Sequence, residues 1–452
     1  MKHQRSVERW CVHEIELTGP SDGNPFAEVE LSARYTYRNR TVEAEGFYDG
    51  DGVYRIRFMP DREGSWEFVT RSNVPELDGY TGAFEATPAT SRGPVRAVGT
   101  RFEYADGTPH LSFGTTCYHW THDMDRDRER ETLRSLAESP FNKIRMCVLP
   151  TGQMDPPELP FAGEDKTRYN PVFFRHLEAR IADLCAIGVE ADVILFHPYD
   201  RGRRGLENMG RELDHAYVRY VVARLAAFRN VWWSVANEYD FNRDKTMDDW
   251  DDLLRTVKRH DPYERLLSIH NGTRMYEVAS VYDFAKPWVT HQSIQHWDAT
   301  LTTEWVKTGK PVVIDEISYE GDATRRWGNV SAQELVARFW EAMTRGGYAG
   351  HGEVYIDSPG RPWIGNGGSL HGQSPPRIAF LRRLMEEGGG FRYLGRRQPA
   401  VVNVELPPGA DYQVDLVDTW NMTIEAVAGT HRDRVRVGLP GRPYLALRMR
   451  RV

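Results

Sequence analysis

The chain has 452 residues, of which 40% are hydrophobic and 27% charged, and its formal net charge is -7. This composition excludes a disordered chain, and the length allows one large domain with one or two smaller ones. An acidic protein gains no free energy from counterion release on a polyphosphate, so nucleic acid is not an expected partner.

The chain carries no visible targeting signal. Residues 1–10 are polar, and no apolar run approaches the length of a membrane span. The four cysteines, Cys11, Cys117, Cys147 and Cys185, form no CxxC pair, and their spacing indicates neither a disulfide framework nor a zinc site. These features predict a cytoplasmic protein with reduced thiols and no membrane contact.

Residues 1–92 have the pattern of a β-sandwich. Short segments of alternating hydrophobicity are separated by turns such as Asp49-Gly50-Asp51-Gly52, and no helical stretch lies between them. Strands at this spacing are typical of two packed antiparallel sheets.

Residues 93–395 show the alternation of a (β/α)8 barrel. Eight apolar segments are predicted as its strands: 110–117, 141–150, 188–198, 230–238, 266–272, 288–297, 311–320 and 347–355. Helical patterns lie between most of them, at 128–140, 171–188, 213–228, 247–260 and 331–346. A doubly wound open sheet is the competing layout, but the turn after the first strand, FGTTCYHWTHD, lacks the GxGxxG phosphate-binding pattern.

Residues 396–452 return to short β segments and predict a small C-terminal β-domain. The expected fold class is therefore α/β, a (β/α)8 barrel flanked by an N-terminal β-sandwich and a C-terminal β-domain.

Two of the predicted barrel strands end in a glutamate. One ends in Asn237-Glu238 and another in Asp315-Glu316. Burying a lone carboxylate is costly, and the catalytic groups of (β/α)8 barrels lie at the carboxyl ends of the strands. By strand order, Glu238 closes the fourth strand and Glu316 the seventh.

A pair of carboxylates on facing strand ends suits glycoside hydrolysis with retention of configuration. One carboxylate attacks the anomeric carbon and the other protonates the leaving oxygen, with the two about 5 Å apart. Their environments must push their pKa values apart, and Arg145 on the predicted second strand could keep the nucleophile ionised. Asp315 points the opposite way from Glu316 in an extended strand, which favours Glu316 as the nucleophile. Asp240, Asp315 and Glu320 are then expected to be loop or supporting acids.

These motifs resemble a known group. Asn237-Glu238 on strand four, Glu316 on strand seven and the Arg145 of FNKIRM on strand two are similar to the clan of (β/α)8 glycoside hydrolases with acid/base and nucleophile on strands four and seven. The segment HLSFGTTCYHWTH and the β-rich N-terminus resemble bacterial proteins that pair a DUF5060-type domain with a DUF4038-like barrel, and the C-terminus resembles their DUF5605-type domain. The resemblance implies Glu238 as general acid/base, Glu316 as nucleophile, Asn237 hydrogen-bonded to the sugar 2-hydroxyl, and Arg145 beside the nucleophile.

Further polar and aromatic residues at the strand ends could recognise a sugar. Sugars present dense hydroxyl groups and flat C–H faces, so polar side chains and a stacking ring are both needed. The candidates for substrate binding, beside Arg145 and Asn237, are His119, Trp120, His197, His270, Asn271, His291, Gln292, His296, Trp297, Glu353 and Trp363. Strand six lacks the His-x-Tyr of commoner clan members, and His291 or His296 is favoured for the contact with the nucleophile.

Two alternatives remain open. His119, His197, His270 and His291 could converge on zinc, although barrel metallohydrolases carry an HxH pair on the first strand and His122 stands at the wrong spacing from His119. A non-catalytic carbohydrate-binding protein on a degenerate barrel would keep the aromatic residues but lack one carboxylate. We therefore expect a glycosidase with a carbohydrate substrate, and no metal or cofactor.

The substrate is suggested only by the resemblance and by loop length. Relatives of the DUF4038-like barrel suggest side chains of plant polysaccharides, with apiosides or other pentosides as candidates. Long loops after strands two and three could close one end of the cleft and favour exo action on a small glycoside. Arg201, Arg203 and Arg204 in the second loop favour a solvated basic loop or a subunit contact over an acidic sugar. The two β-domains could pack on the barrel or bridge subunits of a homo-oligomer.

Overall fold

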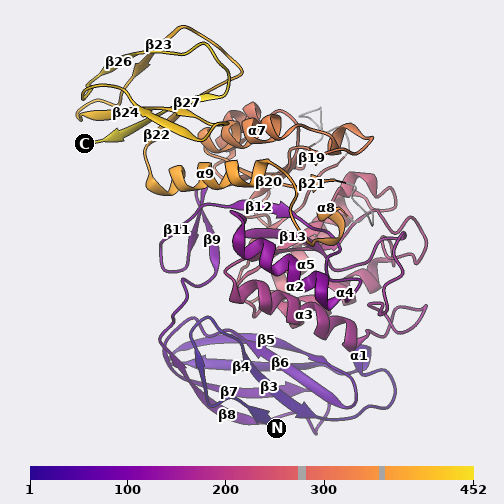
Figure 1. Ribbon diagram of the computed structural model, residues 1–452. Helices are drawn as coiled ribbons and strands as arrows, with labels where there is room; N and C mark the ends of the chain where they lie inside the picture. The colour runs from indigo at the N-terminus through magenta and orange to yellow at the C-terminus, as the bar shows by residue number, and fades with distance from the viewer. Residues whose placement is uncertain (273–280, 356–361) are drawn as a thin grey trace.

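A computed structural model describes residues 1–272, 281–355 and 362–452. The N-terminal sheets, the barrel with its helices and the C-terminal sheets follow one another in space as in the sequence (Figure 1). The parallel eight-stranded sheet in the middle and the antiparallel sheets at either end confirm the predicted α/β architecture of a barrel flanked by two β-domains.

Two packed layers form the N-terminal domain, and β5 takes part in both. The strand order is β1-β3-β6-β5-β4-β7-β8-β2. Inward-facing rings fill the space between the layers, where Tyr35 stacks on Phe58 with ring centroids 4.0 Å apart. The strand β5 changes layer at Gly46, where a Cβ would lie 2.8 Å from Leu31 and 2.9 Å from Ile56. The bounds of the elements are β1 (Lys2–His3), β2 (Ser6–Glu8), β3 (His13–Thr18), α1 (Pro25–Glu28), β4 (Leu31–Tyr37), β5 (Arg40–Tyr48), β6 (Val53–Phe58), β7 (Gly64–Ser72) and β8 (Thr81–Thr87).

A three-stranded antiparallel meander closes the amino-terminal end of the barrel. Its strands are β9 (Val95–Val98), β10 (Arg101–Tyr104) and β11 (Pro109–His110). Phe102 of β10 packs against the barrel, with its ring centroid 4.9 Å from that of Trp232 and 5.1 Å from that of Tyr348. This end of the barrel is therefore filled by side chains, and the opposite end carries the strand-end residues.

The barrel strands run parallel in the order β16-β15-β14-β13-β12-β20-β18-β17. A parallel bridge between His270, just after β16, and Ser293 of β17 joins the two ends of this order and closes the ring. The strands are buried almost throughout because helices cover their outer face. In chain order they are β12 (Phe113–Thr116), β13 (Lys143–Cys147), β14 (Glu190–Phe196), β15 (Val231–Ala236), β16 (Leu267–Ser268), β17 (Gln292–Gln295), β18 (Val312–Glu316) and β20 (Tyr348–His351), with the short pair β19 (Glu320–Gly321) and β21 (Glu353–Val354) beside the last two.

Four of the barrel helices in the described ranges, α2, α3, α5 and α7, begin at a residue whose side chain caps the helix. Asn170 accepts a hydrogen bond from Val172 N at the start of α3, and Thr246 and Asp249 form a capping box at the start of α5. Among the helices in the described ranges, none combines the length and apolar character needed to cross a membrane. The helix bounds are α2 (Arg126–Glu138), α3 (Pro171–Ala186), α4 (Arg211–Leu225), α5 (Met247–His260), α6 (Thr302–Trp305), α7 (Ala332–Thr344), α8 (Trp363–Asn366) and α9 (Ser374–Glu387).

The C-terminal domain consists of a four-stranded sheet and a two-stranded sheet over a small apolar core. The larger sheet has the order β22-β27-β24-β25, and β23 pairs with β26. Its strands are β22 (Gly390–Gly395), β23 (Val401–Glu405), β24 (Tyr412–Asp418), β25 (Thr423–Ala426), β26 (Arg434–Gly438) and β27 (Leu445–Arg451). Trp340 of α7 stacks on Tyr393 of β22 with centroids 5.8 Å apart, which attaches this domain to the barrel.

Buried ion pairs attach the N-terminal domain to the barrel. Arg57 of β6 donates to Glu178 of α3 at 3.0 Å, and Arg224 of α4 donates to Asp49 at 2.9 Å and also to Glu178. Arg224 is fully buried. Because each of these charges depends on a partner across the boundary, the N-terminal domain and the barrel stabilise one another.

Candidate active site

Glu238 follows β15 in the left-handed backbone region, with φ 46° and ψ 51°. This conformation costs a residue other than glycine about 1–2 kcal/mol, which is a sign of functional constraint. The Tyr199 hydroxyl, at the end of β14, donates to Glu238 Oε2 at 2.7 Å. Gly272, beyond β16, makes room for the side chain, since a Cβ there would lie 2.4 Å from Glu238 Cγ.

The environment of Glu238 favours the protonated carboxyl group. Burial and the charge of Glu316 raise the pKa of Glu238 to about 8, although hydrogen bonds with Tyr199 and Gln295 act in the opposite direction. At neutral pH this group therefore carries a proton that it can donate.

Glu316, the last residue of β18, has a different set of neighbours. The Tyr118 hydroxyl donates to Glu316 Oε1, and His270 Nε2 lies 3.3 Å from the same oxygen. Burial acts to raise the pKa of Glu316, but contacts with His270 and Tyr118 and the charge of Arg145 outweigh it and hold this pKa below its usual value. Glu316 is therefore the ionised member of the pair.

Asn237 links the two glutamates through the two tyrosines. Arg145 has only donors, and its Nη2 lies 2.7 Å from Asn237 Oδ1, which fixes the orientation of the amide. Asn237 Nδ2 then donates to the Tyr199 hydroxyl at 2.7 Å and to the Tyr118 hydroxyl at 3.4 Å. A chain of hydrogen bonds thus runs from one carboxyl group to the other, and both amide hydrogens point at tyrosines.

A buried cluster of charges supports this chain from inside the barrel. Lys143 and Arg145 alternate on β13, and both contact Asp192 of β14, at 2.9 Å and 3.1 Å. Asp315 of β18 contacts the same two cations, at 2.5 Å from Lys143 and 3.4 Å from Arg145. Asp315 is fully buried and committed to these partners, in keeping with its expected supporting role.

Several predicted binding residues have structural partners. His197 Nε2 is 2.8 Å from Leu149 O, and Tyr199 N donates to His197 Nδ1, which holds the loop that carries Tyr199. His119 lies beside it, with ring centroids 6.0 Å apart. Trp120 belongs to the buried core of the barrel, so its ring does not offer a free stacking face.

His296, after strand six, donates through its backbone N to Glu316 O at 3.1 Å, but the side-chain contact with Glu316 comes from strand five instead. His291 lies at the closed end of the barrel, between the rings of Phe102 and Trp232, because it precedes β17. His296 Nδ1 accepts a hydrogen bond from Asp298 N, and its ring packs on that of Trp305. The contact falls to His270, which follows β16.

The other predicted residues on and near strand six differ in their surroundings. Gln292 Nε2 donates to Trp305 O at 2.9 Å and so faces the outer helices. Asn271 and Gln295 exchange hydrogen bonds through the Asn271 side chain, which ties the ends of strands five and six together. Trp297 is 43% exposed and remains a candidate stacking ring.

The residues predicted after strand eight have structural partners. Glu353 accepts backbone hydrogen bonds from His371 and Gly372 just before α9. Trp363 is buried and donates through Nε1 to Thr115 Oγ1 at 2.9 Å. These contacts attach Trp363 and residues 371–372 to the barrel, and burial leaves no free stacking face on Trp363.

Metal-type ligands converge at one place in the described ranges. Glu320, His351 and Glu353 bring their donor atoms within 4.8 Å of one another. The carboxylate of Glu320 accepts hydrogen bonds from the backbone N–H groups of Gln373 and Ser374. The carboxylate of Glu353 accepts in the same way from His371 and Gly372, as described above. These acids therefore satisfy the amino-terminal end of α9. The histidines considered for zinc do not gather, since His291 lies at the opposite end of the barrel from His270 and Glu316.

The site also contains residues that were not predicted from the sequence, among them Tyr118, Tyr199, Lys143, Asp192, Ser293 and Gln295. Tyr118 and Tyr199 stand beside selected histidines, so the strand-end signal was present. The two cations at alternate positions of FNKIRM, opposite an aspartate on the next predicted strand, signal a buried charge cluster. Ser293 gives no sequence signal.

Three family profiles match successive parts of the chain. The family profile of the apiosidase-like catalytic domain matches residues 97–355, and profiles of two domains of unknown function, DUF5060 and DUF5605, match residues 6–73 and 386–450. No curated protein matches the chain.

Solved structures show the same architecture. A Bacteroides vulgatus ATCC 8482 protein, described as a candidate glycoside hydrolase, is 36% identical over 99% of this chain and 100% of its own, with a TM-score of 0.93. A family 5 glycoside hydrolase from the same organism is 14% identical, covers 79% of this chain and 93% of its own with a TM-score of 0.62, and shares the fold. The protein is a glycoside hydrolase, and the chain belongs to the family defined by the apiosidase-like catalytic domain.

Proposed function

We propose that the protein hydrolyses its glycoside with retention of configuration, using Glu238 as general acid/base and Glu316 as nucleophile. The observation that carries this proposal is the pair of buried carboxyl groups at the ends of β15 and β18, joined by hydrogen bonds through Tyr199, Asn237 and Tyr118. Their different neighbours shift the two pKa values in opposite directions. A retaining glycosidase needs one protonated and one ionised carboxyl group at neutral pH.

In the first step Glu316 attacks the anomeric carbon, and the bond to the aglycone oxygen breaks as Glu238 gives that oxygen its proton. In the second step Glu238 takes a proton from water, the water oxygen bonds to the anomeric carbon, and the electron pair of the ester bond returns to Glu316. Tyr118 and Tyr199 hold the two carboxyl groups, and both hydroxyls stay protonated because burial and the neighbouring glutamates raise their pKa values.

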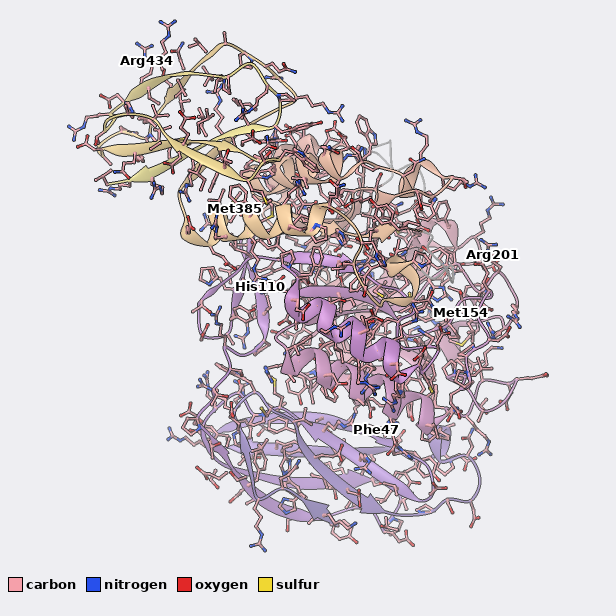
Figure 2. The ribbon with its side chains drawn as sticks, in the orientation of Figure 1. Phe47, His110, Met154, Arg201, Met385 and Arg434 are labelled. Atoms are coloured by element: carbon pink, nitrogen blue, oxygen red, sulfur yellow. The ribbon has the colours of Figure 1, made fainter. Side chains whose placement is uncertain are left out.

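The proposed substrate is a small glycoside or polysaccharide side chain cleaved by exo action, with a terminal apiose or another pentose. The description of the matching family favours apiosides. The loops after strands two and three are tied together beside Tyr199, since Arg203 donates to Gly152 O at 2.9 Å and Arg204 to Thr151 O at 3.1 Å. Met154 and Arg201 of these loops lie on one side of the barrel and His110 of the closed end on the other (Figure 2). A wall of this kind supports exo action. Two of the three loop arginines, Arg203 and Arg204, are hydrogen-bonded to backbone carbonyls within it.

Variants tested on nitrophenyl pentosides, furanosides and hexosides check the proposal. Glu238→Gln and Glu316→Ala should each lower kcat/KM by about 10²-fold or more on the best of these substrates. Glu304→Gln is the control. It changes an exposed carboxylate of α6 that pairs with Lys307, and it should leave activity unchanged. Near-wild-type turnover by either site variant would contradict the assignment.

Azide separates the two roles. Small anions fit the space left by the nucleophile, so azide should restore turnover of Glu316→Ala and yield a glycosyl azide of inverted configuration. An azide product of inverted configuration from the Glu238 variant instead would exchange the two assignments.

A further inference from the structure

We infer that His270 is held as an imidazolium cation against Glu316 by a relay through Ser293 to Asp315, and that this cation stabilises the carboxylate released when the glycosyl ester is hydrolysed. The inference rests on the proposed role of Glu316. His270 lies next to the reacting carboxylate, and Ser293 and Asp315 are positioning residues.

The relay is continuous and buried. His270 Nδ1 lies 3.0 Å from Ser293 Oγ, and Ser293 Oγ lies 2.6 Å from Asp315 Oδ2. His270 and Asp315 are fully buried, and Ser293 is 1% exposed. The backbone places these groups, because His270 and Ser293 form the bridge that closes the barrel and Asp315 lies on the adjacent β18.

The direction of each hydrogen bond follows from the partners. Lys143 and Arg145 hold the pKa of Asp315 well below its usual value despite its burial, so this carboxylate only accepts. Ser293 has one hydroxyl hydrogen and gives it to Asp315. The Ser293 oxygen must then accept from His270, which places a hydrogen on His270 Nδ1.

The surroundings of the other ring nitrogen, Nε2, determine whether the His270 ring is charged. His270 Nε2 lies 3.3 Å from Glu316 Oε1, which already accepts the hydroxyl hydrogen of Tyr118. A neutral ring with its hydrogen on Nδ1 would turn a lone pair toward this ionised carboxylate. The lone pair and the carboxylate would repel each other. A second hydrogen, on Nε2, makes the ring a cation that attracts the carboxylate.

The buried charges around His270 also require a cation. Lys143 and Arg145 face three carboxylates, Asp192, Asp315 and Glu316, all within the barrel. Glu238 adds no charge to this cluster at neutral pH, because its pKa is raised to about 8. An imidazolium at His270 brings the cluster to electrical neutrality, which lowers the cost of burying it.

This charge acts mainly in the second step of the reaction. While Glu316 is an ester it carries no charge, and the imidazolium is left beside a neutral group. When water attacks the anomeric carbon, the ester bond breaks and its electron pair returns to Glu316, where the cation stabilises it. Ser293 and Asp315 keep the ring oriented throughout.

Neutron diffraction of the deuterium-exchanged protein at pH 7 tests the protonation directly. We expect deuterium on both ring nitrogens of His270 and on the Ser293 oxygen along its line to Asp315. A bare Nε2 would overturn the inference. This result depends on neither the substrate nor the identity of the nucleophile, so it stands apart from a failure of the proposed function.

Pre-steady-state kinetics test the consequence. On a dinitrophenyl glycoside of the preferred sugar, Ser293→Ala and His270→Gln should slow hydrolysis of the ester by about 10²-fold and its formation by much less, which enlarges the burst. Ser234→Ala removes a buried strand hydroxyl that donates to Ala236 O at 3.4 Å, and it should change neither step. Equal losses in both steps would show a merely structural role and contradict the inference.

Discussion

At the scale of single residues, two glutamates of identical chemistry are separated by their neighbours. Glu238 is buried near another carboxylate and has tyrosine and amide partners, whereas Glu316 has a histidine and an arginine beside it. Each shift is a free-energy difference between charged and neutral forms of about 1.4 kcal/mol per pKa unit. The neighbours, rather than the residue type, therefore decide which carboxyl group is protonated at neutral pH and which is ionised.

These directions predict a bell-shaped dependence of kcat/KM on pH. Activity should fall as the pH rises through about 8, where Glu238 loses its proton, and should fall again at acid pH below the usual range of a glutamate, where Glu316 gains one. With a dinitrophenyl leaving group, which needs no acid, Glu238→Gln should lose the alkaline limb and keep the acid limb. An alkaline limb that persists in this variant would assign it to another group.

The sequence predicts the two glutamates and their order, because a carboxylate that ends an apolar barrel strand is costly without a task. It does not predict Tyr118 and Tyr199, although both lie within two residues of selected histidines. Beyond a strand end the backbone is irregular, so the alternation that assigns side chains to a face no longer applies. For the same reason the sequence does not predict the contact of His270 with Glu316.

At the scale of elements, the ends of β15 and β16 depend on each other. Glu238 adopts a left-handed turn after β15, and Gly272 after β16 leaves the volume into which its side chain fits. The bridge between His270 and Ser293, which closes the barrel, fixes the position of the end of β16 along the barrel axis. The sequence predicts both strands, but not the close approach between their ends.

Gly272→Ala tests this dependence. The added methyl group would lie 2.4 Å from Glu238 Cγ, so the acid must move and kcat should fall by about 10²-fold, while the melting temperature changes little. Gly365→Ala is the matched control, because a Cβ there meets nothing within 4 Å. Unchanged kcat in Gly272→Ala would show that this contact does not position Glu238.

At the scale of the whole molecule, the three parts were predictable from the change in hydrophobic pattern along the chain. Alternation with period two marks both ends, and mixed strand and helix patterns mark the barrel. The way the parts dock was not predictable, because Asp49, Arg57, Glu178 and Arg224 are far apart in sequence and pair only after folding. These ion pairs make the N-terminal domain part of one stable unit with the barrel.

Glu178→Gln should therefore destabilise the protein by about 3–5 kcal/mol, because it leaves Arg57 and Arg224 buried without their shared partner. Lys307→Ala, which removes an exposed pair with Glu304, should cost less than about 1 kcal/mol. Chemical denaturation at neutral pH measures both. Equally small losses of unfolding free energy in the two variants would mean that the attachment of the N-terminal domain to the barrel does not depend on these charges.

The central claim is that Glu316 forms a covalent bond with the sugar, and it is tested most directly by trapping that ester. A 2-deoxy-2-fluoro glycoside of the preferred sugar with a dinitrophenyl leaving group slows ester hydrolysis, and mass spectrometry of the peptides then locates the attached sugar. We expect one sugar per chain, attached to Glu316. Attachment to Asp315, Glu320 or Glu238, or turnover with inversion and no attached sugar, would contradict it.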